Sequence, residues 1–285
     1  MTLVNLTTAQ ISDADKKKIA GDNLRKLLSW NKPLQKLRVD FPNPKDEFVE
    51  YGRTGIRAKN MTFYDVHGHL GEYNAHYHVP NSRLEKVVED LKYFGNNIVS
   101  EAGLANPDRF IGFTLLNPLR GKEKMLEELK RGDRMGLRGI KLIPTYQGYP
   151  VDGELIEVAC QWAHDHGQII INHFWGSADQ MERLLSKYTK ACFVTAHTTT
   201  AYADVTKKYP NLYICSVPLL TPRACEEVVK SIGADRFLFG TDLLDLPIGW
   251  DLGPILFARI SVKEKRLILR ENLKRILLQY SLKRI

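Results

Sequence analysis

The chain has 285 residues, of which 44% are hydrophobic and 26% are charged. These proportions are ordinary for a soluble globular protein, and the length suits one α/β barrel of about 250 residues. No apolar run approaches the ~20 residues that a membrane span needs. The four cysteines form no Cys-x-x-Cys pair and follow no secretory signal, so we expect a cytoplasmic protein with reduced thiols.

The formal net charge is +8, which is one signature of a nucleic acid partner. The basic residues, however, are scattered or cluster on expected outer helices, as in residues 16–18 and 263–275. Solvated helix faces carry such clusters more often than binding grooves do. We therefore take the charge as weak support for an anionic small-molecule substrate, and as weaker support for nucleic acid.

Residues 1–60 are expected to form an extension ahead of a barrel domain that spans residues 61–285. Ser12 lies three residues before Asp15, a spacing typical of a helix start, and this helix should run to about Trp30. Between residues 31 and 60, prolines and glycines interrupt the chain, which favours a wrapping segment with two short strands.

The extension contains an internal repeat. Residues 11–28 match residues 260–277 at a constant offset, with Ile11-Ser12 opposite Ile260-Ser261, Asn23-Leu24 opposite Asn272-Leu273, and Leu28 opposite Leu277. Chance agreement is one explanation, because two amphipathic helices share a 3.6-residue pattern. The other is that the N-terminal helix packs as the C-terminal one does, for instance on a neighbouring subunit of a homo-oligomer.

After a first expected strand at residues 61–66, amphipathic helices alternate with short apolar strands from residue 81 onward. The expected strands are 61–66, 111–116, 137–143, 168–175, 191–197, 212–217 and 236–241, and the expected helices are 82–94, 122–135, 153–165, 178–188, 201–209 and 222–232, followed by a final pair. This alternation indicates a parallel sheet covered on both sides. The number of units favours a closed (β/α)8 TIM barrel over an open sheet.

The second unit of this barrel is abbreviated. Residues 95–110 are too few for both a strand and a full helix. Either residues 97–100 form a stunted strand or that strand is missing, so we expect the barrel to be distorted there.

Two histidines end the first expected strand. Residues two apart on a strand point to the same side, so His67 and His69 leave it together. Two neutral imidazoles at this spacing can bind one divalent ion. The motif alone is weak, because two solvated histidines at a strand end would look the same.

In such a barrel, the carboxyl ends of the strands carry the chemistry. Polar residues lie at or near these ends of the later strands, namely Lys141, His173, His197 and Asp242. One such residue by itself is usually a hydrogen-bonded core residue. Histidines and an aspartate that reach one rim from separate strands indicate a shared metal ion.

Several motifs occur in a fixed order along the chain, from Asp-Val-His-Gly-His at 65–69 through Gly-Ile-Lys-Leu at 139–142 and Ile-Ile-Asn-His at 170–173. They continue with Thr-Ala-His at 195–197, Phe-Gly-Thr-Asp at 239–242 and Asn-Leu-Lys-Arg-Ile-Leu at 272–277. As a set they resemble the amidohydrolase superfamily, in the branch often called amidohydrolase 2. The resemblance implies a TIM barrel that binds a divalent ion, often zinc.

By the same resemblance, the ion is held by His67, His69, His173 and Asp242, and His197 is a catalytic residue or a ligand of a second ion. We expect hydrolysis of an amide, lactone or ester bond in a small anionic molecule by a metal-activated water. Asp242 would move the proton and His197 would stabilise the oxyanion.

Two further residues are expected to contact the substrate. Lys141 would bind a substrate carboxylate as an ammonium or, alternatively, be carbamylated and bridge a second ion. Trp175 stands two residues after His173, where it would narrow the pocket.

Three other functions stay open. A non-oxidative decarboxylase of the same superfamily would use the same ion, with Asp242 or His197 protonating the carbon. A TatD-like nuclease would need a glutamate on the strand where this chain has Lys141. A barrel that kept its metal ion but lost turnover would be a binding protein.

Overall fold

Six parallel strands form the sheet of the described chain, and they are hydrogen-bonded in sequence order from β1 to β6. This computed structural model describes residues 3–33, 45–69, 96–243 and 246–281. The strands are β1 (Thr114–Leu115), β2 (Gly139–Leu142), β3 (Ile169–Asn172), β4 (Cys192–Thr195), β5 (Leu212–Cys215) and β6 (Phe237–Leu238). All run in the same direction because a helical segment returns the chain between successive strands.

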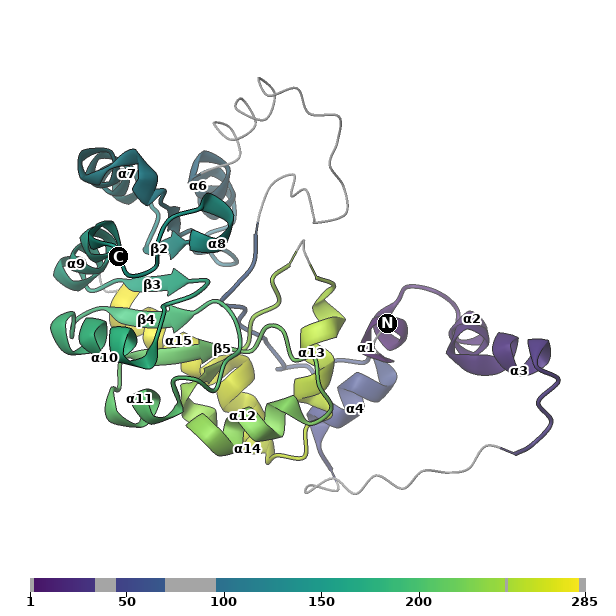
Figure 1. The fold of residues 1–285 in the computed structure, drawn as a ribbon. Helices are drawn as coiled ribbons and strands as arrows, with labels where there is room; N and C mark the ends of the chain where they lie inside the picture. Colours follow the sequence, from purple (N-terminus) through teal and green to yellow (C-terminus); the bar gives the residue numbers. More distant parts are fainter. Residues whose placement is uncertain (1–2, 34–44, 70–95, 244–245, 282–285) are drawn as a thin grey trace.

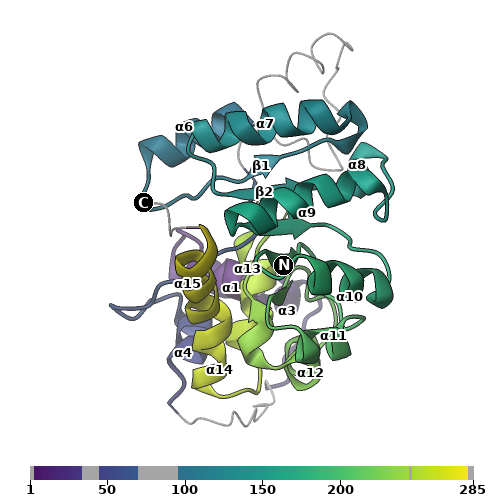
Figure 2. The same ribbon diagram turned by 90° about the vertical axis from the view of Figure 1, so that its left-hand side faces the viewer.

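The helices that join these strands cover the outside of the sheet (Figures 1 and 2). They are α7 (Lys122–Arg134), α9 (Glu154–His166), α10 (Ala178–Lys187), α11 (Ala203–Lys208) and α12 (Ala224–Ile232), with the short α8 (Pro144–Gln147) after β2 and the 3-10 turns η2 (Pro118–Arg120) and η3 (Ala234–Arg236). After β6 follow α13 (Ile248–Leu256), α14 (Val262–Arg266), the π-helical η4 (Leu267–Glu271), α15 (Asn272–Ile276) and the π-helical η5 (Leu277–Ser281). This alternation agrees with the predicted (β/α)8 TIM barrel.

Successive side chains of each strand point to opposite faces of the sheet, so they enter two different apolar cores, one outside the sheet and one inside it. Ile170 of β3 and Phe193 of β4 face outward and pack with the covering helices. Ile169 and Ile171 face inward, where they share a core cluster with Ile276 of α15. The last helix therefore closes the inner core of the barrel.

The predicted first strand, residues 61–66, is not a regular strand. It runs beside β6, where the Val66 N–H donates to the Phe239 carbonyl at 3.0 Å, and Gly68 forms an isolated parallel bridge with Leu243. Two residues earlier, the Tyr64 N–H bonds instead to a carbonyl of η4. The segment thus crosses from a helix to the sheet, and a continuous ladder does not form.

For the second β/α unit, the sequence left two alternatives, a stunted strand at residues 97–100 or no strand, and the structure agrees with the second. Residues 97–100 are not a stunted strand, because they lie in α6 (Asn96–Ala105). Asn96 holds this helix against the sheet, since its side-chain amide oxygen accepts the Leu115 N–H at 2.7 Å and its amide nitrogen donates to the Leu115 carbonyl at 3.1 Å. The predicted helix 82–94 lies outside the described residues.

The N-terminal part is helical. It contains α1 (Leu3–Thr8), α2 (Asp13–Lys17), the π-helical η1 (Lys18–Asp22), α3 (Asn23–Leu27) and α4 (Glu47–Thr54). The helix start predicted at Ser12 is confirmed, because the Ser12 side chain accepts the Asp15 N–H. The described part of the predicted wrapping segment, residues 45–60, contains α4 and not the expected strands.

Helices α1 and α4 pack against each other and against α13, so they belong to the same body as the barrel (Figure 1). The Thr7 hydroxyl of α1 donates to the Gly52 carbonyl of α4 at 3.0 Å. The division into an extension (1–60) and a barrel domain (61–285) stays a prediction. Among the helices that the structure describes, none combines the length and the apolar character needed to cross a membrane.

Candidate metal centre

The backbone around His67 is fixed to the end of β6. The N–H groups of Thr241 and Asp242 both donate to the His67 carbonyl, at 3.2 and 2.7 Å. Gly240 makes this approach possible, because a Cβ there would lie 2.4 Å from Cys215 Sγ and 3.2 Å from His67 Cβ. Two distant parts of the chain therefore meet at this point.

Asp65 holds this junction from inside. Its Oδ1 accepts the His67 N–H at 2.9 Å and the Thr241 N–H at 3.1 Å, and its Oδ2 accepts the Thr241 hydroxyl. Burial raises the pKa of Asp65 to about 6, although these donors oppose the rise. Asp65 was not among the predicted site residues. The available signal was its spacing, since an aspartate commonly accepts an N–H two residues later.

The predicted histidines and Asp242 come together at the carboxyl ends of the strands. Nε2 of His69 lies 2.8 Å from Asp242 Oδ1, and Nε2 of His67 lies 3.2 Å from it. The ring centroids of His67 and His173 are 5.6 Å apart, those of His67 and His197 5.5 Å, and those of His173 and His197 4.5 Å. The ligand atoms of His67, His69 and His173 lie within 4.8 Å of one another, as do those of His67, His197 and Asp242.

The hydrogen bonds of His67 define its protonation. Its Nδ1 lies 2.9 Å from the Ala196 carbonyl oxygen, so Nδ1 must carry the proton. Burial, together with Lys141 and the other histidines, lowers the pKa of His67 well below its ordinary value, and the ring is neutral. Its Nε2 therefore presents a lone pair to the centre. A carbonyl on the far nitrogen is the usual support of a metal-ligating histidine.

Asp242 supplies the negative charge of the centre. Burial alone would raise the pKa of Asp242, but the hydrogen bond with His69 and the nearby positive groups outweigh burial and lower it. The carboxylate is therefore ionised at neutral pH. Asp242 also has a φ of 52°, in the left-handed region that few non-glycine residues adopt, and this turn follows directly on β6.

Lys141 enters the centre from β2. Ile140 and Leu142 pack outward, so the alternation of the strand directs Lys141 inward. Its Nζ lies 2.6 Å from His67 Nε2. Burial lowers the pKa of Lys141 to about 7, although the Asp242 carboxylate opposes this change. Near neutral pH the amine can thus either bind an anion or act as a neutral donor.

A nitrogen of His173 that lacks a hydrogen-bond partner within the described chain indicates whether a metal ion fits these residues. Its Nε2 is buried and has no hydrogen-bond partner among the described residues. Burial lowers the pKa of His173 to about 2, so the ring is neutral and one nitrogen has an unused lone pair. A buried acceptor without a partner costs free energy unless a ligand satisfies it. Several imidazoles and one carboxylate fit a divalent ion such as zinc or manganese.

Trp175 does not lie at the mouth. It is fully buried, its Nε1 donates to the Val194 carbonyl at 3.0 Å, and its ring packs edge-to-face on Phe193. A side chain inside the core cannot touch a substrate, so the predicted role of Trp175 is corrected. The exposed Tyr146 of α8 has its ring centroid 5.2 Å from that of His173. It was not predicted because α8 was not predicted.

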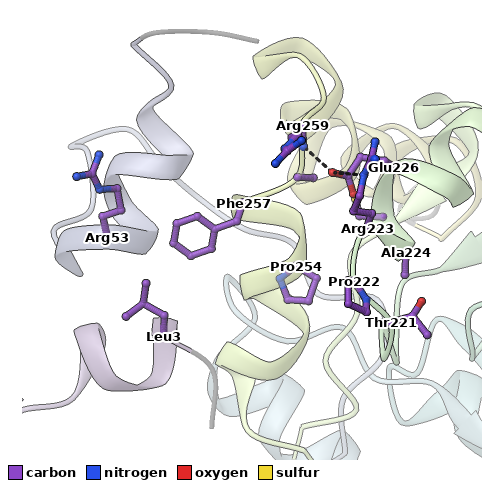
Figure 3. A pocket seen from close by; sticks show the side chains of 12 residues that line it. Leu3, Arg53, Thr221, Pro222, Arg223, Ala224, Glu226, Pro254, Phe257 and Arg259 are labelled. Atoms are coloured by element: carbon purple, nitrogen blue, oxygen red, sulfur yellow. Dashed lines mark hydrogen bonds and ion pairs between the residues drawn. The ribbon is translucent and has the colours of Figure 1, made fainter. Parts of the chain in front are cut away.

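A separate cavity of about 700 Å³ lies between the N-terminal helices and the barrel (Figure 3). Its walls include Leu3 of α1, Arg53 of α4, Pro254 and Phe257 at the end of α13, and the start of α12. None of the predicted site residues lines it. The cavity is therefore not part of the histidine cluster.

A parallel (β/α)8 barrel that gathers imidazoles and a carboxylate at the carboxyl ends of its strands has the architecture of metal-dependent barrel enzymes. The amidohydrolase 2 family model, described as "Amidohydrolase", matches residues 48–277. The chain belongs to this family, within the amidohydrolase superfamily. Comparison with curated protein sequences gives no match.

Solved structures show the same fold. An uncharacterised TIM-barrel protein from Bordetella bronchiseptica is 19% identical, with a TM-score of 0.58 over 69% of this chain and 83% of that one. A 2,6-dihydroxybenzoate decarboxylase from Rhizobium is 17% identical, with a TM-score of 0.52 over 67% and 78% of the two chains. A dihydroxybenzoic acid decarboxylase from Polaromonas, with bound manganese and 2-nitroresorcinol, is 18% identical, with a TM-score of 0.51 over 64% and 73%.

Proposed function

We propose that this protein is a metal-dependent hydrolase that cleaves an amide, lactone or ester bond in a small anionic molecule. One observation carries the proposal, namely two overlapping groups of possible metal ligands, His67, His69 and His173 in one and His67, His197 and Asp242 in the other, which share His67. A divalent ion bound there would supply a nucleophilic water at neutral pH and polarise the carbonyl of the substrate.

In this proposal His67, His69, His173 and Asp242 hold the ion. Zinc suits this set because three of its ligands are imidazole nitrogens. Manganese is the alternative, since it is bound in the Polaromonas relative. A second ion would need a further bridging ligand, and a carbamylated Lys141 is the candidate.

Asp242 acts as the base in this mechanism. Its Oδ1 lies between the Nε2 atoms of His67 and His69, and the carboxylate is ionised at neutral pH. It would accept a proton from the attacking water and return it to the leaving group. His197 would donate a hydrogen bond to the developing oxyanion.

Lys141 gives the site its preference for anions. Its ammonium form would bind a substrate carboxylate beside His67, and the net charge of +8 would favour the approach of such molecules. The four cysteines are free and buried, which supports the proposed reduced, cytoplasmic setting.

A non-oxidative decarboxylase is the second candidate, and the names of the solved relatives favour it. Two of those described above act on dihydroxybenzoates. In that reaction Lys141 and the ion would bind the carboxylate or its neighbouring oxygen, and Asp242 or His197 would protonate the carbon. The same site residues therefore serve either reaction.

The experiment combines bound-metal analysis with a substrate panel of esters, lactones, amides and hydroxybenzoates. We expect about one ion per chain in the wild type and loss of the ion in a His67→Ala/His69→Ala variant. Acid release without CO2 supports hydrolysis, and CO2 release supports the decarboxylase. An unchanged metal content in the double variant would show that the centre is assigned wrongly.

A further inference from the structure

The cavity between the N-terminal helices and the barrel has the size of a ligand site. Its volume of about 700 Å³ lies within the range of about 300–1,000 Å³ that is usual for small-molecule pockets. Its walls come from α1, α4, α12 and α13 with the loops beside them. Helix α1 packs on α4 and on α13, and α12 contacts α13, so packed helices define the shape of the cavity.

One part of the cavity wall is apolar. Leu3, Pro222, Pro254, Phe257 and Ala258 contribute their side chains to it. Leu3 is 51% exposed and Phe257 is only half-buried, although both belong to segments that pack on other elements. An apolar group placed in the cavity would remove this surface from water, which is favourable.

The other part of the wall is basic. Arg53 at the end of α4, Arg223 before α12 and Arg259 after α13 all line the cavity. Figure 3 shows their guanidinium groups toward one side of the cavity, with Leu3 and Pro254 toward the other. The cavity is therefore amphipathic.

These guanidinium groups are poorly compensated. Among the described residues that line the cavity, Glu226 alone is acidic, against three arginines. Its Oε1 lies 4.0 Å from the Arg223 Nε, at the limit of an ion pair, and accepts the backbone N–H of Arg259 at 3.0 Å. Within the described chain, the side chains of Arg53 and Arg259 have neither a hydrogen bond nor an ion pair.

A solvated position is the ordinary explanation for any single exposed arginine. Arg53 also lies in the last turn of α4, where a cation interacts favourably with the helix dipole. Neither explanation accounts for three arginines from separate elements around one cavity whose remaining wall is apolar. An anion there would pair with the guanidinium groups that lack a partner within the described chain.

We propose that this cavity binds an amphipathic anion, namely a small molecule with a carboxylate or phosphate group on an apolar chain. The planar guanidinium matches both groups, since it can donate two parallel hydrogen bonds to their oxygens. The apolar wall binds the chain. A purely apolar molecule would use only that wall, and a small anion would use only the arginines. This site is separate from the metal centre, because none of the predicted metal ligands lines it.

The first test is calorimetric titration of the full chain with octanoate and with octyl phosphate, beside 1-octanol and acetate. We expect one molecule of at least one anionic amphiphile per chain, and the tighter of the two identifies the preferred head group. Octanol and acetate should bind at least about tenfold more weakly, because each lacks one half of the recognised structure. Absence of binding by both amphiphiles would overturn the proposal, and so would octanol that binds as tightly as they do.

The second test locates the bound amphiphile with exposed-residue variants. Arg53→Gln/Arg259→Gln should weaken its binding about tenfold or more, because the charge-assisted hydrogen bonds are lost. Thr221→Trp keeps the arginines but narrows the cavity, and should weaken binding as well. The matched control is Arg57→Gln/Arg134→Gln, which removes the same charge at exposed positions outside the cavity and should bind as the wild type does. Equal affinities of the two double variants would refute the site.

The third test separates this cavity from the metal centre. The His67→Ala/His69→Ala variant and the EDTA-treated wild type should both bind the amphiphile with the affinity of the untreated wild type, whether or not the chain is a hydrolase. Loss of binding in both would place the amphiphile in the metal centre and overturn the proposal.

Discussion

Lys265 and Asp46 form a fully buried ion pair between α14 and the start of α4, with 2.6 Å between Nζ and Oδ2. Burial lowers the pKa of Lys265, and the hydrogen bond with Asp46 opposes this change. Asp46 also accepts the N–H groups of Phe48 and Val49, and so caps α4. One carboxylate thus starts a helix and pairs with the amine of another.

We predict that Lys265→Met lowers the free energy of unfolding by about 3–5 kcal/mol, because the Asp46 carboxylate stays buried without its partner. Urea unfolding measures this change. Lys263→Met, at an exposed position two residues earlier in the same helix, should change stability by less than ~0.5 kcal/mol. Equal stability of the two variants would contradict the prediction.

Glu157 forms a charged network on the outer face of α9 and α10. Its oxygens accept from Lys187 at 2.5 Å, Tyr188 at 2.7 Å and Arg183 at 2.6 Å. The hydrogen bond from Lys187, followed by those from Tyr188 and Arg183, lowers the pKa of Glu157 to about 2. Because the pKa of Glu157 is lower in the folded chain than in the unfolded chain, its ionised form stabilises the fold. This stabilisation is complete at pH values above the unfolded pKa of 4.5, and it is lost as the pH falls toward the folded pKa of about 2.

We predict that Glu157→Gln lowers stability by about 1 kcal/mol at pH 7, a value limited by solvent screening. It should also flatten the fall in stability between pH 4.5 and pH 2. Thermal unfolding across this range measures both effects. The exposed Glu101→Gln should leave the pH profile of the wild type unchanged, and an identical profile for Glu157→Gln would count against the network.

Among the elements, α4 ends in a glycine that the contact with α1 requires. Gly55 has a φ of 73°, and a Cβ there would lie 2.4 Å from the Thr7 carbonyl oxygen. Gly148 at the end of α8 has a φ of 70°, but no neighbouring residue that the structure describes comes within 4 Å of the equivalent Cβ. An alanine at Gly148 would therefore introduce backbone strain alone, whereas an alanine at Gly55 would introduce the same strain and a steric clash with α1.

We predict that Gly148→Ala costs about 1 kcal/mol and Gly55→Ala about 2–3 kcal/mol, since only the second displaces α1. Urea unfolding gives the two values. Hydrogen exchange should show faster opening of α1 in Gly55→Ala alone. If both variants lost the same stability, α1 would not depend on this contact.

The sequence predicted the elements that have a clear period. Helices such as α7 and α10 match their predicted bounds to within a residue, because an apolar face at 3.6-residue spacing must be buried. It failed at residues 61–66, and at residues 97–100 it left open whether a strand forms, because short apolar runs fit either a strand or a helix. Their structure depends on distant partners, namely β6 for the first and Leu115 for the second.

The sequence predicted the candidate site only through the rule that the carboxyl ends of parallel strands lie at the same edge of a barrel. That rule placed His67, His173, His197 and Asp242 together before any distance was known. The rule could not exclude Trp175 from the site, because it gives the end of the strand and not the direction of the side chain. In the structure the Trp175 side chain turns back and donates to the Val194 carbonyl. The support given by Asp65 also depends on a pairing with Thr241 that only the folded chain reveals.

At the scale of the whole molecule, the centre joins both ends of the barrel, so a bound ion should stabilise the complete fold. We predict that removing the ion with EDTA lowers the Tm by about 5–10 °C, as expected for a ligand near 100 times its Kd. Differential scanning calorimetry measures the shift. The His67→Ala/His69→Ala variant should melt at one temperature with or without EDTA, and an insensitive wild type would contradict the prediction.

The junction of Asp65 with Thr241 spans 176 residues of sequence, and this separation has a consequence for biosynthesis. A ribosome that adds roughly 5–20 residues per second needs about 10–35 s to pass from one to the other. During that interval the early histidines have been translated, but their acidic counterpart has not. If Asp242 is a ligand, as proposed, a nascent polypeptide cannot present the complete ligand set until residue 242 has been added, and we expect a product truncated before that residue to bind the ion more weakly.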